Sequence, residues 1–532
     1  MNIFTDVNPM PLLELDNWSV SGPKRILVEP LTLQVPQGHI MGIAGESGSG
    51  KTLTLLSIAG LLPPGLTASG ELQFRGKDAQ HLRRDNSDVA GLRSFRRKSV
   101  GFIFQEPMSA LNPTMRCGKQ LLECMDEDNR PRKLQTALSL LRETGLSDPE
   151  RIMRSYPFQI SGGQRQRLMI AMALANKPEL LLADEPTTAL DAELKHQVSA
   201  LMTELCRSRG VALMLVSHDL ELLGKYCDSL LVMQQGRVVE QGSARLLMQT
   251  PEHPYTRMLL DCRPALEKRG QTLPLPGESR ITLNTTPDAH AEEQLLIQVD
   301  EKQFPAATKP VLQHIAFSLR RGETICILGQ SGSGKSTLAR IVCGLDPHFK
   351  GFVRDENREK PSRGMIQLVF QDPLSALNPN QKVLETLEEA LRFGGGKQKI
   401  NDRVRETAKE LLREVRLPEH TWNAYPHELS GGQCQRVCIA RALCAHPEVI
   451  ILDESVSALD PSVQASVLNL LASLQQKKKL GYLFITHDLD VAAWFSHRLL
   501  VLKNGEVDVF GATEELMRHP PTDYTKHLFS FR

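Results

Sequence analysis

Residues 45–52 read Gly-Glu-Ser-Gly-Ser-Gly-Lys-Thr, and residues 329–336 read Gly-Gln-Ser-Gly-Ser-Gly-Lys-Ser. Both stretches match the pattern of a phosphate-binding loop, in which glycines let consecutive backbone N–H groups point at phosphate oxygens. The start of the helix that follows such a loop adds a favourable dipole. A short apolar run, typical of a strand, precedes each stretch. Two matches in this context argue against plain glycine-rich turns, so the sequence predicts two nucleotide sites.

Several residues of the two loops have an expected role. Lys51 and Lys335 would bridge the β- and γ-phosphates, and the hydroxyls of Thr52 and Ser336 would be offered to Mg²⁺. The remaining positions assigned to the phosphate cradle are Gly45, Ser47, Gly48, Gly50, Gly329, Ser331, Gly332 and Gly334. The sequence thus predicts that a nucleotide with β- and γ-phosphates binds with Mg²⁺ at both sites.

The chain repeats one unit twice. Beyond the loops, three short motifs recur: Ser-Gly-Gly-Gln at Ser161 and Ser430, Asp-Glu at Asp184 and Asp453, and His-Asp at His218 and His487. All three pairs lie 269 positions apart (430 − 161, 453 − 184, 487 − 218), and so do Tyr255 and Tyr524 near the end of each half. A repeat of this length predicts two copies of one domain.

The two copies are separated by a stretch of different character. Prolines and scattered charge interrupt the apolar periodicity in residues 263–294. We expect a first domain at 1–262, an irregular linker at 263–294 and a second domain at 295–532. In each half, continuous apolar runs such as 180–183 and 449–452 alternate with helical stretches. This alternation predicts an α/β fold with a mainly parallel sheet covered by helices.

The composition is that of an ordinary globular protein. Of the 532 residues, 41% are hydrophobic and 23% are charged, and 63 Lys and Arg nearly balance 62 Asp and Glu. No global charge therefore argues for nucleic acid or an anionic membrane surface. No apolar window approaches the ~20 residues of a membrane-spanning helix, and the first residues lack the pattern of a signal peptide. We expect a cytosolic chain that reaches a membrane through partner subunits.

Two carboxylates follow an apolar run in each half, as Asp184-Glu185 and Asp453-Glu454. An aspartate at the end of such a strand can hold Mg²⁺ or its waters, and the adjacent glutamate can orient and polarise an attacking water. One such pair alone is a weak signal, because carboxylates often follow strands. Its repetition in both halves predicts metal-binding aspartates and water-activating glutamates.

His218 and His487 each close an apolar strand in the form Ser/Thr-His-Asp. A lone histidine in this position would more often cap a helix or fill the core, but the repetition favours a hydrogen bond to the γ-phosphate. Gln105 and Gln371 each follow a phenylalanine, and their amides can coordinate Mg²⁺ or a water. All four residues are therefore counted among the catalytic candidates.

The combination of these motifs carries a family resemblance. Ser-Gly-Gly-Gln together with the loops, Asp-Glu and His resembles the ATP-binding cassette (ABC) ATPases over nearly all of both halves. More narrowly, Tyr-Pro-Phe-Gln at 156–159, Glu-Pro-Met-Ser-Ala-Leu-Asn-Pro at 106–113 and His-Pro-Tyr-Thr-Arg at 253–257 resemble the oligopeptide, dipeptide and nickel importer branch. The two halves are similar to the two ATPase subunits of that branch, fused in one chain.

The resemblance implies two P-loop NTPase cassettes in tandem, each with a mainly parallel sheet and helices, an antiparallel β subdomain and a helical signature subdomain. It also implies that the cassettes close head to tail around two ATP molecules. One ATP would then be shared by Lys51 with Ser430, Gly431 and Gly432, and the other by Lys335 with Ser161, Gly162 and Gly163. Asp191 and Asp460 would cross the interface.

The resemblance further implies an importer ATPase, whose partners would be two integral-membrane permease subunits and an extracytoplasmic solute-binding protein. The chain would lie peripherally at the cytoplasmic face of the inner membrane, with Gln105 and Gln371 linking nucleotide state to the permeases. Its cargo would be di- or oligopeptides, nickel or a metal–chelator complex. The alternative is a soluble tandem-cassette ATPase that acts on ribosomes or DNA, although the sequence lacks the long charged linker or inserted modules of such relatives. Glu185 and Glu454 disfavour a non-hydrolysing module.

Two features depart from patterns within the family. The aromatic residue that stacks on adenine is matched by Phe304 in the second half, but by Gly22, with Trp18 nearby, in the first. Cys262 is the only cysteine between Cys227 and Cys326. The four-cysteine iron–sulfur segment of several relatives is therefore expected to be missing.

Overall fold

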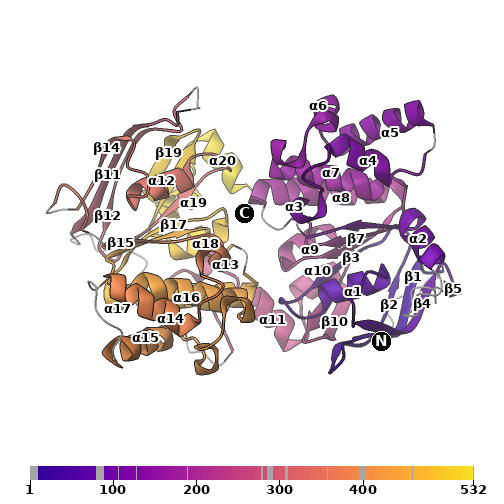
Figure 1. Ribbon diagram of the computed structural model, residues 1–532, viewed down its shortest axis with the longest axis horizontal. Coiled ribbons are helices and arrows are strands. Elements are labelled where there is room, and N and C mark those ends of the chain that lie inside the picture. Colours follow the sequence, from indigo (N-terminus) through magenta and orange to yellow (C-terminus); the bar gives the residue numbers. More distant parts are fainter. Residues whose placement is uncertain are drawn as a thin grey trace. The chain divides into compact units, whose positions relative to one another are not determined.

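The structure is a computed structural model of the whole chain. It describes residues 10–530 except 79–88, 106, 128, 188–189, 277–279, 284–291, 306–308, 356–357, 363, 395–401 and 458. The chain divides into two compact units, Met1–Leu260 and Asp261–Arg532, which are coloured indigo to magenta and magenta to yellow in Figure 1. Each unit has its own sheets and its own hydrophobic core.

The centre of the first unit is a six-stranded sheet in the order β10-β9-β3-β8-β7-β6. Its strands are β3 (Ile40–Ala44), β6 (Val100–Ile103), β7 (Leu180–Asp184), β8 (Ala212–Val216), β9 (Ser229–Gln234) and β10 (Arg237–Ser243). Neighbours from β6 to β9 pair in parallel, and only β10 runs antiparallel to its neighbour β9. Every residue of β3, β7 and β8 is buried, as expected of parallel strands covered on both faces. The sheet confirms the predicted α/β class.

A second sheet in this unit is antiparallel, in the order β2-β1-β4-β5. Its strands are β1 (Leu13–Ser21), β2 (Ile26–Val35), β4 (Thr67–Phe74) and β5 (Lys77–Asp78). Side chains of β1 and β2 share one apolar cluster with α1 (Lys51–Ile58) and with one face of the central sheet. The antiparallel sheet is therefore joined to the loop region through a continuous core.

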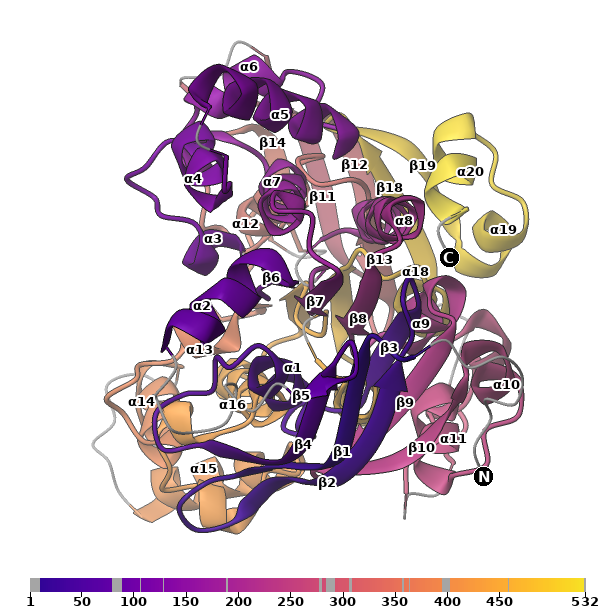
Figure 2. The same cartoon turned by 90° about the vertical axis from the view of Figure 1, so that its right-hand side faces the viewer.

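Of the remaining helices of the first unit, α2 (Val89–Lys98) packs on the same apolar cluster as α1, and the others cover the other face of the sheet or form a helical subdomain. These others are α3 (Pro107–Ala110), α4 (Cys117–Cys124), α5 (Arg130–Glu143), α6 (Pro149–Arg154), α7 (Gly162–Leu174), α8 (Ala192–Arg209), α9 (Leu220–Tyr226), α10 (Ala244–Gln249) and α11 (Pro254–Asp261). Figure 2 shows α4, α5, α6 and α7 gathered at one end of the unit, away from β1, β2 and β4. Buried side chains of these four helices pack together in one cluster.

The second unit repeats this topology. Its central sheet has the order β15-β16-β17-β13-β18-β19, and its antiparallel sheet has the order β12-β11-β14. The strands are β11 (Glu293–Lys302), β12 (Leu312–Arg320), β13 (Thr324–Leu328), β14 (Lys350–Arg354), β15 (Ile366–Val369), β16 (Val449–Asp453), β17 (Gly481–Ile485), β18 (Arg498–Lys503) and β19 (Glu506–Ala512). The helices are α12 (Lys335–Val342), α13 (Pro373–Ala376), α14 (Val383–Gly394), α15 (Asp402–Glu414), α16 (Gly431–Leu443), α17 (Pro461–Lys478), α18 (Leu489–Phe495), α19 (Thr513–Arg518) and α20 (Asp523–Phe529).

The segment after α11 packs onto the second unit where the structure describes it. Leu273 is buried, its N–H donates to Asn469 Oδ1 at 2.8 Å, and its carbonyl accepts from Asn469 Nδ2 at 2.9 Å. The indole N–H of Trp494 donates to the carbonyl of Gln271 at 3.1 Å. This segment thus contributes to the fold of the second unit. β11 begins at Glu293, inside the range assigned to the linker.

Within the described part of the chain, no helix has both the length and the apolar character needed to span a membrane.

Candidate active sites

Each phosphate-binding loop lies between a buried central strand and the helix that follows it, β3 and α1 in the first unit and β13 and α12 in the second. Gly45 has φ +148°, and a Cβ there would lie 2.2 Å from the carbonyl oxygen of Met233 in β9. Only glycine therefore lets the loop pass this close to the neighbouring strand. Gly50, at φ +102°, caps α1 without a side-chain hydrogen bond, which leaves backbone N–H groups at the helix start for an anion.

The loop lysines are buried within their own loops. Lys51 Nζ donates to the carbonyl oxygens of Gly45 at 2.7 Å and Glu46 at 2.9 Å. Lys335 Nζ makes the same two bonds, to Gly329 at 2.7 Å and Gln330 at 3.0 Å. Both ammonium groups are therefore fixed beside the backbone of the cradle, where a phosphate oxygen can replace a carbonyl as acceptor.

The side chains assigned to Mg²⁺ are adjacent in both units. Thr52 Oγ1 donates to Asp184 Oδ1 at 3.0 Å, and Ser336 Oγ donates to Asp453 Oδ1 at 3.3 Å. Burial raises the pKa of Asp184 to about 6, and the hydrogen bond from Thr52 lowers it in part. Burial likewise raises the pKa of Asp453. The loop lysine lowers each pKa as well, but it does not offset the effect of burial.

The donor set fits a magnesium ion bound with a nucleotide. A hydroxyl and a carboxylate offer the oxygen ligands that Mg²⁺ prefers, usually together with phosphate oxygens and water. A divalent cation there would favour the charged form of both aspartates and so would oppose the effect of burial on their pKa. The buried Oγ atoms of Ser49 and Ser333, in the two loops, also have no hydrogen-bond partner among the described residues.

Three further candidates converge on one point in each unit. In the first, Gln105 Nε2 donates to Glu185 Oε2 at 3.2 Å, and His218 Nδ1 lies 3.5 Å from the same oxygen. In the second, the matching distances are 2.8 Å from Gln371 Nε2 to Glu454 Oε2 and 3.7 Å from His487 Nδ1 to that oxygen. The structure therefore brings each predicted glutamate, histidine and glutamine together directly beyond the aspartate of its strand.

The backbone at the two glutamates was not foreseen from the sequence. Glu185 has φ +44° and Glu454 has φ +47°, in the left-handed region that residues with a side chain seldom adopt. The N–H of Glu185 donates to the carbonyl of Val216 at 3.1 Å, and that of Glu454 donates to Ile485 at 2.9 Å. Such conformations persist where the surrounding structure enforces them, and they concentrate at functional sites. In both units this left-handed conformation is accompanied by a hydrogen bond to the neighbouring strand.

The Ser-Gly-Gly motifs begin the helices α7 and α16. Ser161 and Ser430 are N-caps, and each side chain accepts at 3.3 Å from the backbone N–H three residues later. Gln164 and Gln433 complete the capping boxes by accepting from the serine N–H groups. Both serines are exposed. In the first unit the ribbon of α7 stands apart from that of α1 in two perpendicular views (Figures 1 and 2).

Asp191 and Asp460 are N-caps of α8 and α17, the helices after the Asp-Glu strands. The carboxylate of Asp191 accepts from the N–H of Leu194 at 2.9 Å. A structural role as a cap is therefore visible for Asp191 in addition to the interfacial role that the resemblance implies.

The two units differ at the position expected to stack on adenine. Phe304 follows β11, its side chain is 40% exposed, and Lys302 Nζ lies 4.8 Å from its ring centroid. Gly22 follows β1 in the first unit and has no side chain to offer. Trp18 is fully buried and its indole N–H donates to Ser57 Oγ at 2.9 Å, so its ring belongs to the core.

Two protein-family models match the sequence of the chain. The model described as "ABC transporter" matches residues 28–188 and again 312–457. The model described as "Oligopeptide/dipeptide transporter, C-terminal region" matches residues 239–288, which include α11 and Tyr255. The first match covers both loops, both Ser-Gly-Gly motifs and both Asp-Glu pairs.

Similar proteins match the chain over nearly its whole length. An uncharacterized ABC transporter ATP-binding protein YejF of Escherichia coli (strain K12) is 39% identical, over 98% of this chain and 99% of the relative. A peptidoglycan transport ATP-binding protein YejF of Agrobacterium fabrum is 37% identical, over 99% and 97%. A glutathione import ATP-binding protein GsiA of Pectobacterium atrosepticum is 37% identical, over 98% and 89%.

Solved structures include an RNase-L inhibitor with a TM-score of 0.59, which covers 94% of this chain and 92% of that chain. Its sequence identity is 19%, so the likeness concerns the fold alone. It supports the predicted fold, two cassettes in one chain.

Proposed function

Since the chain belongs to the ABC transporter ATPases, as a tandem member of the oligopeptide/dipeptide branch, we propose that it powers the import of small peptides or peptide-like molecules. ATP binding and hydrolysis at two sites would drive a permease in the membrane. The observation that carries this proposal is the convergence of glutamine, glutamate and histidine beside a phosphate-binding loop in both units. A chain that only bound nucleotide would not need two complete hydrolytic sets.

The residues of each site support in-line attack of water on the γ-phosphate. Glu185 and Glu454 would orient and polarise the water, and His218 and His487 would bind the γ-phosphate. The loop lysine would leave its backbone carbonyls and bridge the β- and γ-phosphates. Mg²⁺, when held by the threonine or serine hydroxyl and the aspartate, neutralises charge on the phosphate oxygens. The protein then supplies positioning and charge compensation, and no covalent step on the protein is required.

Each ATP would lie between a loop of one cassette and the Ser-Gly-Gly of the other. Two features support this arrangement: Ser161 and Ser430 are exposed at helix N-termini that favour an anion, and α7 stands apart from α1 within the first unit. Lys51 would share its nucleotide with Ser430, Gly431 and Gly432. Lys335 would share its own with Ser161, Gly162 and Gly163.

The permeases would dock beside the two glutamines. In the first unit a cavity of about 460 Å³ lies between α2, β6, α4 and α7, and its lining includes Phe104, Met169 and Met172. Phe104 directly precedes Gln105 and is 44% exposed; Phe370 precedes Gln371 and is 42% exposed. An exposed apolar patch of this kind suits a helix of a membrane partner. Movement there would reach the hydrolytic glutamate through one hydrogen bond.

The partners would be two integral-membrane permeases and an extracytoplasmic solute-binding protein, and the chain would lie at the cytoplasmic face of the inner membrane. Peptide cargo is supported by the family model at residues 239–288 and by the relative named for glutathione import. Nickel has no comparable support among the relatives described above. The likeness to the RNase-L inhibitor concerns the fold and favours neither function.

The test is uptake of a labelled tripeptide, with glutathione as the first probe. The chain, assembled with its permeases in lipid vesicles and supplied with the binding protein, should accumulate the probe only with Mg-ATP. The Glu185→Gln/Glu454→Gln double variant should abolish uptake without loss of the assembled complex. Active hydrolysis with no uptake of any tested di-, tri- or oligopeptide would contradict the peptide assignment.

A further inference from the structure

One pair of repeated residues has no role in the chemistry above. Tyr255 belongs to α11 and Tyr524 to α20, near the end of each unit. The backbone N–H of Glu46 donates to Tyr255 Oη at 3.2 Å, across 209 positions of sequence. The N–H of Gln330 donates to Tyr524 Oη at 3.2 Å, across 194 positions. The same contact has thus formed in both cassettes, between a C-terminal helix and the second residue of the phosphate-binding loop.

The contacted peptide group is the one that also holds the loop lysine. In the first unit its carbonyl oxygen, on Gly45, accepts from Lys51 Nζ, and its N–H, on Glu46, donates to Tyr255. Because a peptide unit is planar, a bond at one end fixes the orientation of the other. The second unit has the same arrangement at the peptide between Gly329 and Gln330. When the lysine turns to a phosphate, the tyrosine remains as the anchor of this peptide.

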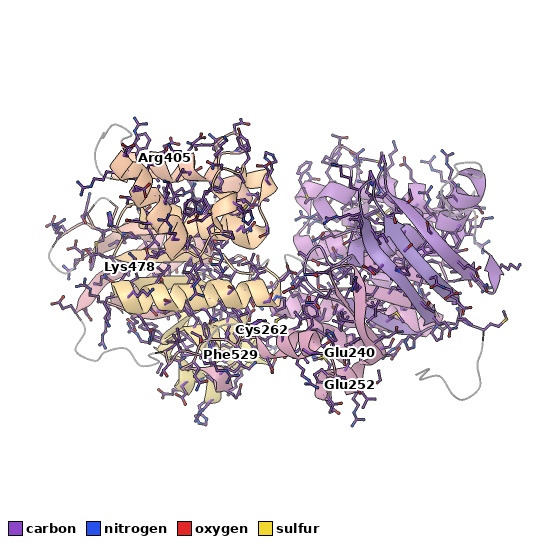
Figure 3. All side chains as sticks on the ribbon, turned by 90° about the horizontal axis from the view of Figure 1, so that it is seen from below. Glu240, Glu252, Cys262, Arg405, Lys478 and Phe529 are labelled. Carbon is purple, nitrogen blue, oxygen red and sulfur yellow. The ribbon has the colours of Figure 1, made fainter. Side chains whose placement is uncertain are left out.

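The tail that carries Tyr255 is itself tied to the sheet. The carboxylate of Glu240, in β10, accepts from the N–H groups of Glu252 at 2.7 Å and His253 at 3.2 Å. Figure 3 labels Glu240 and Glu252 together at the edge of the first unit. Tyr255 is 5% exposed and packs within the apolar cluster that includes Leu247 and Leu259. Its hydroxyl is therefore presented to the loop from a fixed position.

The second unit fixes its tyrosine by different bonds. Asp508 of β19 accepts hydrogen bonds from the hydroxyls of Thr522 and Thr525 through the same carboxylate oxygen. Tyr524 Oη also donates to the carbonyl of Leu502 at 3.4 Å. Lys503 Nζ lies 5.0 Å from the centroid of its ring. Different side chains thus hold the tyrosine hydroxyl at the equivalent position in the two units. This argues that the contact between hydroxyl and loop is itself required.

We propose that Tyr255 and Tyr524 are positioning residues of the two nucleotide sites. Each holds the first peptide group of its loop in the orientation that receives the phosphates, and each makes the C-terminal segment of its cassette a part of the ATP site. The inference rests on the ATPase activity and is independent of the transported cargo. A hydroxyl that only satisfied a buried polar group would affect stability but would leave nucleotide affinity unchanged.

The direct test is binding of a non-hydrolysable β,γ-imido ATP analogue with Mg²⁺ to the full chain. Tyr255→Phe and Tyr524→Phe each keep the ring and remove the hydrogen bond to the loop, whose usual net strength corresponds to a change of about fivefold. Each variant should weaken one of the two sites by that factor and leave the other unchanged. In steady-state hydrolysis, the KM for ATP should rise while kcat changes by less than about twofold, because the bond is present before and during the reaction.

Two matched variants serve as controls. Tyr226→Phe removes a hydroxyl that donates to the carbonyl of His196, and Tyr482→Phe removes one that donates to the carbonyl of Leu471. Both hydroxyls lie outside the loops, so affinity for the analogue should stay within about twofold of the parent chain. A further variant, Asp508→Asn, alters the carboxylate that holds Thr522 and Thr525 and leaves Tyr524 in place. It should weaken binding of the analogue at the second site only.

Hydrogen–deuterium exchange gives an independent readout. Without nucleotide, the peptides that span residues 40–50 in Tyr255→Phe and 324–334 in Tyr524→Phe should exchange faster, and the other loop should not. Weakened binding at one site with faster exchange of that loop supports the proposal. Unchanged affinity at both sites, or equal weakening by the two control variants, overturns it.

Discussion

Gln105 and Glu185 lie 80 positions apart in the chain, yet the side-chain amide of the glutamine donates to the carboxylate of the glutamate at 3.2 Å. The second cassette repeats the bond between Gln371 and Glu454 at 2.8 Å. Each glutamine follows an exposed phenylalanine. One hydrogen bond thus separates the surface proposed for a permease from the carboxylate proposed to activate water.

The first prediction concerns the two glutamates. Glu185→Gln/Glu454→Gln keeps the shape of both side chains but removes the charge that polarises the water, so steady-state phosphate release should fall by about 10²–10⁴-fold. ATP binding, measured by equilibrium dialysis, should persist. Glu29→Gln, which alters an exposed ion pair with Arg237, should leave hydrolysis unchanged. Turnover close to the parent rate in the double variant would show that other residues activate the water.

The second prediction follows from the raised pKa of Asp184. The folded-state pKa, about 6, exceeds the ordinary value of 3.8 because the carboxyl is buried. The folded state therefore binds this proton more tightly, and stability falls as pH rises from about 4 to about 6. Above that window, Asp184→Asn should stabilise the nucleotide-free chain, by roughly 1–3 kcal/mol from a shift of this size.

Calorimetry without metal or nucleotide checks this expectation. The Tm of the transition assigned to the first cassette should be higher in Asp184→Asn than in the parent chain at pH 8, and the difference should shrink toward pH 4. The same variant should lose stabilisation by Mg-ATP at that cassette. A difference that is constant with pH, or larger at pH 4, would contradict the burial of a charged carboxylate.

The third prediction compares two effects of adding a Cβ to a glycine, a clash with a neighbouring backbone atom and strain from a positive φ. Gly45 and Gly65 both have positive φ, but a Cβ on Gly45 would lie 2.2 Å from a backbone oxygen, whereas one on Gly65 would meet nothing within 4 Å. Gly65→Ala should cost about 1 kcal/mol of stability and leave nucleotide binding intact. Gly45→Ala must displace β9 or the loop and should abolish ATP binding at the first site. Equal effects of the two substitutions would remove the case for a close approach.

The site could be predicted largely from sequence because its residues sit at strand ends. Apolar runs such as 180–183 and 449–452 mark buried parallel strands, and residues that follow such runs meet at one edge of the sheet. This places the aspartates and glutamates beside the loops. The left-handed backbone of Glu185 and Glu454 could not be read in this way, because the bond to the neighbouring strand that accompanies it is a tertiary contact.

Trp18 shows a second limit of sequence patterns. In β1 the buried positions are Leu13 and Leu15, then Trp18 and Val20, because the strand register shifts between Leu15 and Trp18. A bulge of this kind reverses which face a residue occupies. Simple alternation from Leu13 and Leu15 would leave Trp18 on the exposed face. The observed burial instead assigns it to the core.

The segment after α11 shows a third limit. Prolines and low apolar periodicity are typical of a linker, but they do not reveal hydrogen bonds made with a distant helix. Leu273 and Asn469 exchange two such bonds across 196 positions. Among the described residues of the segment, the buried apolar side chains are too few and too scattered to form a pattern.

The central claim is that each ATP is shared by both cassettes, and pairs of substitutions test it. Under head-to-tail pairing, Lys51→Ala and Ser430→Arg damage the same site, whereas Lys51→Ala and Ser161→Arg damage different sites. Residues that act as one unit have non-additive effects, because the second substitution removes what the first already disabled.

The measurement is steady-state ATP hydrolysis by the chain assembled with its permeases, for the single and double variants in parallel. The account predicts that Lys51→Ala/Ser430→Arg keeps the activity of the worse single variant and that Lys51→Ala/Ser161→Arg falls well below either single variant. The opposite pattern, with Lys51→Ala/Ser161→Arg no worse than its singles and Lys51→Ala/Ser430→Arg far below them, would show that each cassette works with its own Ser-Gly-Gly and would contradict the account.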